Sequence, residues 1–160
     1  MADSDGLKQL LKESAFFQDF DNATLTMIVP CVTPRIFEAG HYILRDGDPA
    51  DTFYLLRHGT VAIELAAPPR GRLVLQTLTD GDLLGWSWLV PPYRWSFDAR
   101  AVSLVRCLGL DGKRLRTLCE QNHDFGYVLL QRYVRVMAAR LTAARLQMLD
   151  LYAPTPVSNF

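Results

Sequence analysis

Between residues 32 and 110 the sequence alternates every few residues between short apolar runs and turn residues such as glycine, proline and aspartate. This spacing is typical of β-strands joined by tight turns. One open sheet of eight short strands would leave unpaired edges and an uncovered face, so two packed sheets are expected. The pattern predicts an eight-stranded, double-sheet jelly roll, with strands near residues 35–37, 42–44, 53–56, 61–65, 73–76, 83–84, 97–101 and 105–108.

Helical periodicity replaces the strand pattern at the N-terminal side of this stretch. Leu7, Leu10 and Leu11 recur at helical spacing. A second short helix is expected to begin at Asp21 or Asn22, both of which are good N-caps, and to run to Pro30. These two elements are predicted to be small helices that cover the roll.

The C-terminal side, residues 111–152, is also predicted to be helical. Asp111 is a good N-cap for a short helix that breaks near Asn122, and a long helix follows over residues 124–152. A chain of 160 residues is long enough for one hydrophobic core and too short for two ordinary domains. We therefore predict one mainly β domain over residues 1–152, composed of N-terminal helices (1–31), a β-roll (32–110) and C-terminal helices (111–152), with a tail at 153–160.

The long helix carries two apolar stripes. One stripe steps alternately by four and three residues, as the a and d positions of a coiled coil do. A second stripe beside it contains Leu129, Tyr133, Val136 and Leu146. One stripe can face the roll and the other a twin helix, which predicts a homodimer; the alternative is that both pack inside one subunit. The predicted dimer seam is Leu130, Val134, Met137, Leu141, Ala144, Met148 and Leu151.

The composition excludes several classes of partner. Seventeen basic residues balance seventeen acidic ones, so no global field draws the chain to nucleic acid or to an anionic membrane. No apolar stretch approaches the roughly 20 residues that span a bilayer, and the polar start lacks a secretory signal. The protein is therefore expected to be cytoplasmic, with no membrane partner.

Enzymatic function is not expected from the residue inventory. The three histidines, His41, His58 and His123, are scattered and form no metal-ligand pair. The three cysteines are far apart and odd in number, so we expect ordinary buried thiols rather than disulfides or a zinc site. The sequence predicts neither a metal nor a cofactor.

Three stretches together resemble a known family. Residues 43–61, ILRDGDPADTFYLLRHGTV, and residues 78–85, LTDGDLLG, are similar to the roll of cyclic-nucleotide-binding domains of the Crp/Fnr type. Residues 136–141, VMAARL, are similar to the dimer helix of those regulators. The resemblance implies a regulatory domain of that fold. Related regulators carry a helix-turn-helix after this helix, whereas here a short tail follows, so no direct DNA binding by this chain is expected.

The resemblance weakens at the ligand site. In the family, the residues that correspond to LTDGDLLG lead directly into a short helical segment, the phosphate-binding cassette. A glutamate just after the glycine at its start holds the ribose, and an arginine pairs with the cyclic phosphate. Trp86 stands at the glutamate position and Trp95 at the arginine position, while Arg94 lies one residue earlier. An indole donates one hydrogen bond and accepts none, so these contacts are lost. The expected effector pocket consists of Gly85, Trp86, Ser87, Trp88, Arg94, Trp95 and Ser96, with Tyr127, Leu130, Gln131 and Val134 on the pocket-facing side of the long helix.

Three functional interpretations stay open at this point. The aromatic pocket can bind a small-molecule effector that is flatter or more apolar than a nucleotide. Alternatively, Arg94 and the backbone N–H groups of the cassette can retain a genuine cyclic-nucleotide site. Finally, the tryptophans can fill the cavity and leave a ligand-free dimerisation scaffold that acts through a protein partner.

Overall fold

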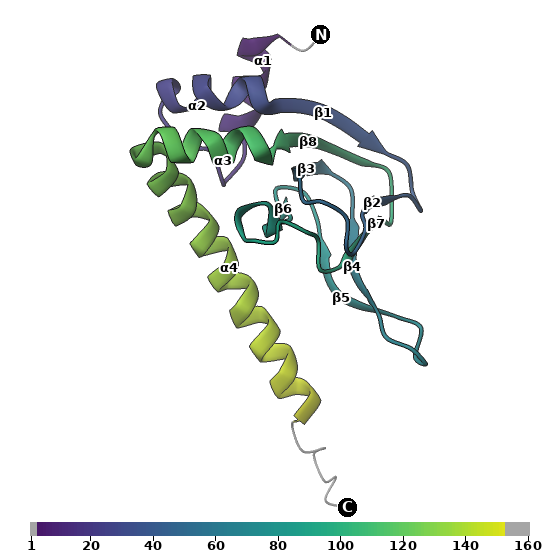
Figure 1. Ribbon diagram of the computed structural model, residues 1–160. Helices are drawn as coiled ribbons and strands as arrows, with labels where there is room; N and C mark the ends of the chain where they lie inside the picture. The colour runs from purple at the N-terminus through teal and green to yellow at the C-terminus, as the bar shows by residue number, and fades with distance from the viewer. Residues whose placement is uncertain (1–2, 153–160) are drawn as a thin grey trace, which may run out of the picture.

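The computed structural model describes residues 3–152, which form two four-stranded sheets around one core, with helices along one side (Figure 1). All strand pairings are antiparallel. The predicted double-sheet jelly roll is confirmed. The first sheet has the order β1 (Val32–Phe37), β8 (Val105–Asp111), β3 (Thr52–His58) and β6 (Leu83–Leu84); the second has the order β2 (Tyr42–Leu44), β7 (Asp98–Ala101), β4 (Val61–Ala66) and β5 (Arg72–Leu78).

Strand alternation builds the interior of the roll. In the second sheet Val61 lies opposite Ala101 and Ile63 opposite Ala99, and all four side chains are buried. Successive side chains of a strand point to opposite faces, so Glu64, next to Ile63, belongs to the other face of the same sheet. The roll therefore has an apolar inner layer and a separate set of charged groups on this sheet.

Strand β3 is buried on both faces, which explains its unbroken apolar run. Residues 53–56 are all buried. One face of the first sheet contributes to the roll interior, and helices lie along its other side (Figure 1). A strand covered on both sides needs apolar residues at consecutive positions rather than at alternate ones.

The second N-terminal helix begins where its cap predicts. Asp21 accepts a hydrogen bond from the backbone N–H of Thr24 at 2.7 Å and so caps the second helix. Between the two helices, Phe16, Phe17 and Phe20 form a buried aromatic cluster with edge-to-face contacts. These elements are α1 (Ser4–Lys12), α2 (Asn22–Ile28) and the short 3-10 helix η1 (Val29–Cys31).

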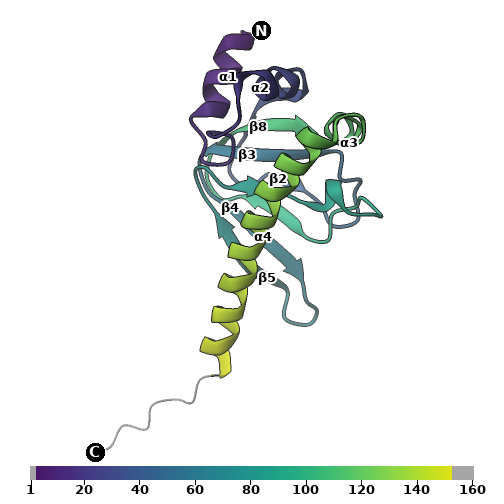
Figure 2. The same ribbon diagram turned by 90° about the vertical axis from the view of Figure 1, so that its left-hand side faces the viewer.

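Two helices follow the roll, α3 (Gly112–Gln121) and α4 (His123–Tyr152). Asp111 caps α3 by accepting from the backbone N–H of Arg114 at 3.1 Å. The first half of α4 packs on the roll, whereas every residue from 141 to 152 is exposed. Figures 1 and 2 show α4 crossing the roll and then continuing beyond it. Within residues 3–152, no helix combines the length and the apolar character needed to cross a membrane.

Candidate functional site

Residues 85–97, here called the cassette segment, connect β6 to β7 and contain all three tryptophans of the chain. The segment begins with Gly85 at φ 99°, a conformation that favours glycine. The buried indole of Trp95 lies against this glycine, because a Cβ on residue 85 would come within 2.5 Å of the ring. Trp95 therefore fills the space directly next to the cassette glycine.

Trp88 lies in the short 3-10 helix η2 (Ser87–Leu89) and is the largest fully buried side chain of the described residues. Its indole stacks on Phe53 of β3, with 4.5 Å between ring centroids and 6° between ring planes. Its Nε1 donates a hydrogen bond to the hydroxyl of Tyr133 at 2.9 Å. The cassette segment is thus fixed both to the roll and to α4.

Tyr133 completes this connection from the helix side. Its hydroxyl accepts from Trp88 and donates to the carbonyl oxygen of Gly85 at 3.4 Å. Burial raises the pKa of the Tyr133 hydroxyl well above its usual range, although the hydrogen bond from Trp88 acts in the opposite direction. The hydroxyl therefore stays protonated and keeps its role as a donor.

Arg94, which the sequence suggests as an anion ligand, is directed to a turn of the roll. The side chain is exposed, and its guanidinium Nη1 donates to the carbonyl oxygen of Gly47 at 2.8 Å. The backbone of Trp95 pairs with the same turn, through hydrogen bonds with Gly47 and Asp48. The neighbouring predicted pocket residues differ in burial: Trp86 is half-buried, Ser87 is buried and Ser96 is exposed.

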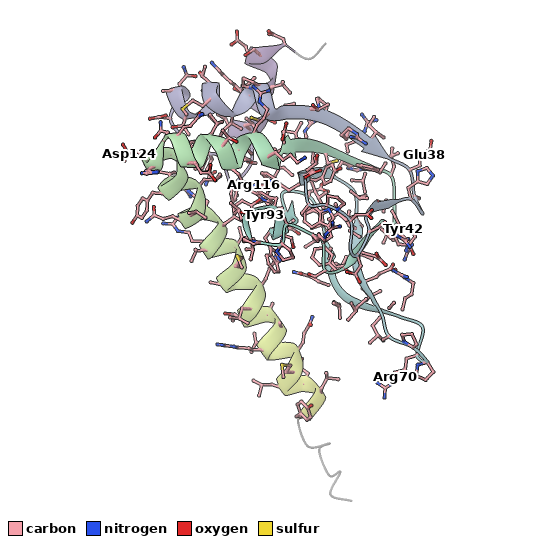
Figure 3. All side chains as sticks on the ribbon, in the orientation of Figure 1. Glu38, Tyr42, Arg70, Tyr93, Arg116 and Asp124 are labelled. Carbon is pink, nitrogen blue, oxygen red and sulfur yellow. The ribbon has the colours of Figure 1, made fainter. Side chains whose placement is uncertain are left out.

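Arg116 of α3 holds the other end of the cassette segment. Its Nη1 donates to the carbonyl oxygen of Trp88 at 2.6 Å, and its guanidinium lies 4.1 Å from the ring centroid of Tyr93 (Figure 3). Tyr93 has a positive φ of 57°. This contact was not predictable from the sequence, because Trp88 and Tyr93 lie more than twenty residues before Arg116.

The pocket-facing side of α4 differs from the expected one. Tyr127, Leu130, Gln131 and Val134 are all exposed, and the Gln131 Nε2 donates to the Tyr127 hydroxyl along the helix surface at 2.9 Å. One residue along a helix is a rotation of about 100°. The neighbouring stripe of the helix faces the roll instead, with Phe125, Leu129 and Tyr133 buried and Val136 half-buried.

The predicted dimer seam lies on the exposed side of α4. All seven of its residues are exposed within the described chain. Large apolar side chains rarely form a continuous exposed stripe on a monomeric protein. Exposed fractions along the stripe are 47% for Leu130, 62% for Val134, 40% for Met137, 53% for Leu141, 55% for Met148 and 81% for Leu151.

A cavity of about 400 Å³ lies between α4 and the roll, outside the cassette segment. None of the expected pocket residues lines it. Its walls come from the N-terminal region, from β5 and the turn before and start of β6, and from α4. The lining residues include Phe16, Leu78, Leu83, Arg132, Arg135 and Arg140.

Sequence reasoning missed the three arginines, although a signal for Arg140 was present. Leu129, Tyr133, Val136 and Arg140 follow one another at steps of four, three and four, so Arg140 continues the stripe that faces the roll. Its guanidinium donates to the backbone carbonyl of Leu83. An arginine in such a stripe marks the point where the helix meets polar groups of the roll.

A second set of charged residues lies in the second sheet and was not predicted. Glu64 is 3% exposed and accepts from Arg72 Nε at 2.8 Å and from Arg100 Nε at 2.6 Å. Asp98 accepts from the backbone N–H of Asp46 at 2.7 Å and also pairs with Arg72. Burial alone would raise the pKa of Glu64, but the hydrogen bonds from Arg72 and Arg100 outweigh it and lower that pKa.

This lowered pKa predicts acid-sensitive stability. A carboxylate whose pKa is lower in the folded state stabilises the fold fully above its ordinary value of 4.5, and the contribution is lost as the pH falls through the folded pKa. We expect Glu64→Gln to lower the free energy of unfolding at pH 7 by about 1–3 kcal/mol. The difference between wild type and variant should shrink below pH 4.5, as measured by urea denaturation from pH 7 to pH 3. Glu120→Gln, at an exposed position of α3, is the matched control; an equal effect of both variants would contradict the assignment.

The cysteines and the possible metal ligands are the remaining candidate groups. Cys31 and Cys107 are buried and Cys119 is half-buried, and all three are free thiols. Burial raises the pKa of the Cys107 thiol to about 11, which disfavours the nucleophilic thiolate. Within residues 3–152, no three His, Cys, Asp or Glu side chains lie close enough together to hold a metal ion.

Comparison with known sequences gives relatives over most of the chain. The model of the family described as cyclic nucleotide-binding domain matches residues 34–122, more than half of the chain. The "CRP-like cAMP-activated global transcriptional regulator" of Mycobacterium tuberculosis is 24% identical over 145 residues, which are 91% of this chain and 63% of that protein. A putative potassium channel protein of Rhodopseudomonas palustris is 31% identical over 102 residues, which are 64% of this chain and 24% of the channel. The chain thus spans less than two thirds of these relatives.

Solved structures agree with this result. A putative cyclic nucleotide-binding protein from Geobacter metallireducens superposes with a TM-score of 0.75 at 27% identity, covering 88% of this chain and 99% of that one. A cyclic nucleotide-binding domain from Methylobacillus flagellatus superposes with a TM-score of 0.78 at 18% identity, covering 96% and 86%, and shows the shared fold. Because the family model matches more than half of the chain and the fold agrees with these structures, this chain belongs to the cyclic nucleotide-binding domain family.

Proposed function

We propose that this chain is a non-catalytic sensor domain that works as a homodimer and whose effector pocket has diverged from tight binding of cAMP or cGMP. One observation carries the proposal: the buried Trp95 ring occupies the space beside Gly85, within 2.5 Å of where a Cβ would be. A phosphate held by the cassette would need that space and a cation beside it. Arg94 instead binds the carbonyl oxygen of Gly47.

The energetic consequence of these replacements is large. Trp86 and Trp95 stand where family members carry a carboxylate and a guanidinium. The charge-assisted hydrogen bonds to the ribose and to the cyclic phosphate are therefore missing. Each is worth about 1.5–3 kcal/mol. Their combined loss would move a micromolar dissociation constant to the millimolar range.

Titration calorimetry with cAMP and cGMP tests this proposal. We expect a Kd weaker than about 1 mM for both nucleotides, because the cassette offers neither charged partner. The variant Arg94→Met is the control, since its guanidinium is the nearest candidate for a displaced phosphate ligand. A micromolar Kd that Arg94→Met abolishes would overturn the proposal and establish a genuine nucleotide site built from Arg94 and cassette N–H groups.

The ligand-free scaffold is a second candidate, favoured by the dense packing of Trp88 and Trp95 in the cassette segment. In that case the dimer would act through a protein partner alone. The cavity between α4 and the roll favours the sensor instead, because its volume of about 400 Å³ lies within the range of small-molecule sites. Binding of a small molecule in this cavity would favour the sensor over the scaffold.

The relatives suggest how such a sensor is used. The M. tuberculosis protein is named as a cAMP-activated transcriptional regulator, and a Dictyostelium discoideum relative is named as a regulatory subunit of cAMP-dependent protein kinase. We propose that this chain likewise passes the state of its pocket to another domain or protein. The exposed seam of α4 is the surface through which two copies would associate.

A further inference from the structure

The cavity between α4 and the roll has mostly apolar walls. Leu78 and Leu83 face it from the roll, and Phe16, Val136 and Ala139 face it from the helical side. Figure 2 shows α4 crossing over the strands of the roll, with β5 beyond it. About 400 Å³ holds roughly a dozen water-sized groups, the size of a small organic molecule. An occupant of this space needs an apolar body.

The charges at the cavity are unbalanced. Three arginines line it, Arg132, Arg135 and Arg140, against one carboxylate, Asp82. Arg132 is already paired with Asp19 at 2.7 Å. The Asp82 carboxylate accepts a hydrogen bond from the backbone N–H of Thr79 at 2.9 Å and so stabilises the turn before β6.

Two guanidinium groups are left without a carboxylate partner among the described residues. Arg140 donates to the carbonyl oxygen of Leu83, and no hydrogen bond or ion pair of Arg135 occurs within residues 3–152. Burial lowers the pKa of Arg140, while Asp82 and Tyr133 oppose that change. A partly buried cation with a free donor edge is stabilised when a planar anion pairs with it.

We propose that this cavity binds a small organic acid, with its apolar body against Leu78 and Leu83 and its carboxylate on Arg140 and Arg135. The proposal rests on the sensor function above and names its ligand class. A nucleoside fits these walls poorly, because apart from the arginines only Gln76 and Asp82 offer polar side chains to its base and ribose. The apolar walls and the fork geometry of the guanidinium favour an aromatic or medium-chain carboxylate.

Titration calorimetry with phenylacetate and octanoate tests the proposal, and phenylacetamide is the neutral comparison. We expect at least one of the two acids to bind with a Kd below about 1 mM and the amide to bind at least tenfold more weakly, because it lacks the charge. Arg140→Met should weaken the acid about ten- to a hundredfold, the range for losing a charge-assisted hydrogen bond. Arg135→Met should weaken binding of the acid several-fold. Because Arg135 is exposed, this variant still tests the proposal if the Arg140 variant does not fold.

Arg145→Met is the matched control, since Arg145 is exposed on the same helix outside the cavity. It should leave the Kd unchanged. Equal binding of acid and amide, equal loss in all three variants, or no binding of either acid below about 1 mM would overturn the inference. Failure of the sensor proposal would give a different result: cAMP would then bind the unliganded protein with a micromolar Kd, whatever the acids do. Failure of this inference alone leaves both nucleotide and acid unbound.

Discussion

Replacing Trp88 with alanine is expected to lower the free energy of unfolding by about 3–5 kcal/mol, the usual cost of deleting a large buried aromatic side chain. The indole is fully buried and stacked on Phe53, so its removal leaves a cavity between β3 and α4. It also leaves the Tyr133 hydroxyl without its donor. At 160 residues, such a loss corresponds to a drop in Tm of roughly 10 °C.

Urea denaturation followed by far-ultraviolet circular dichroism measures the effect. Tyr133→Phe separates the hydrogen bonds of the hydroxyl from the packing of the ring, because it removes the former and keeps the latter. We expect this variant to lower the free energy of unfolding by about 1 kcal/mol. Trp86→Ala is the matched control in the same segment, since that indole is only half-buried and its loss should matter less. A Trp88→Ala effect no larger than that of Trp86→Ala would show that the cassette segment is not held by its central tryptophan.

The fold was predictable because its signals are local. Strand alternation, turn glycines and caps such as Asp21 and Asp111 act over a few residues, and each predicted strand overlaps an observed one. The apolar run of β3 does not alternate, but its short length and its flanking turns still predict a strand. Consistent local signals of this kind specify one topology.

The site was less predictable because its contacts join distant residues. Glu64 and Arg100 are 36 positions apart, and Trp88 and Tyr133 are 45 positions apart. The side of α4 that faces the roll was not predictable, because two apolar stripes lie next to each other and periodicity alone does not say which of them meets the roll. The structure distinguishes them through Tyr133, whose hydroxyl reaches the cassette.

The exposed stripe of α4 leads to the second large prediction, that Leu141→Asp converts a dimer into a monomer. Leu141 lies in the middle of the seam, is 53% exposed in the single chain and is not part of the buried core. In a symmetric dimer the change occurs twice, and burying one leucine side chain is worth about 1.5–3 kcal/mol. We expect the dimer Kd to rise by a hundredfold or more.

Sedimentation velocity across a range of protein concentrations measures this change, and Thr142→Asp is the control. Thr142 is also exposed, but one residue along a helix turns its side chain by about 100° away from the seam. The aspartate there should leave the dimer intact, whereas the one at Leu141 places two carboxylates against an apolar interface. If both variants or neither dissociated, the seam would not be the interface, and the apolar stripe of α4 would have to be covered by a different partner.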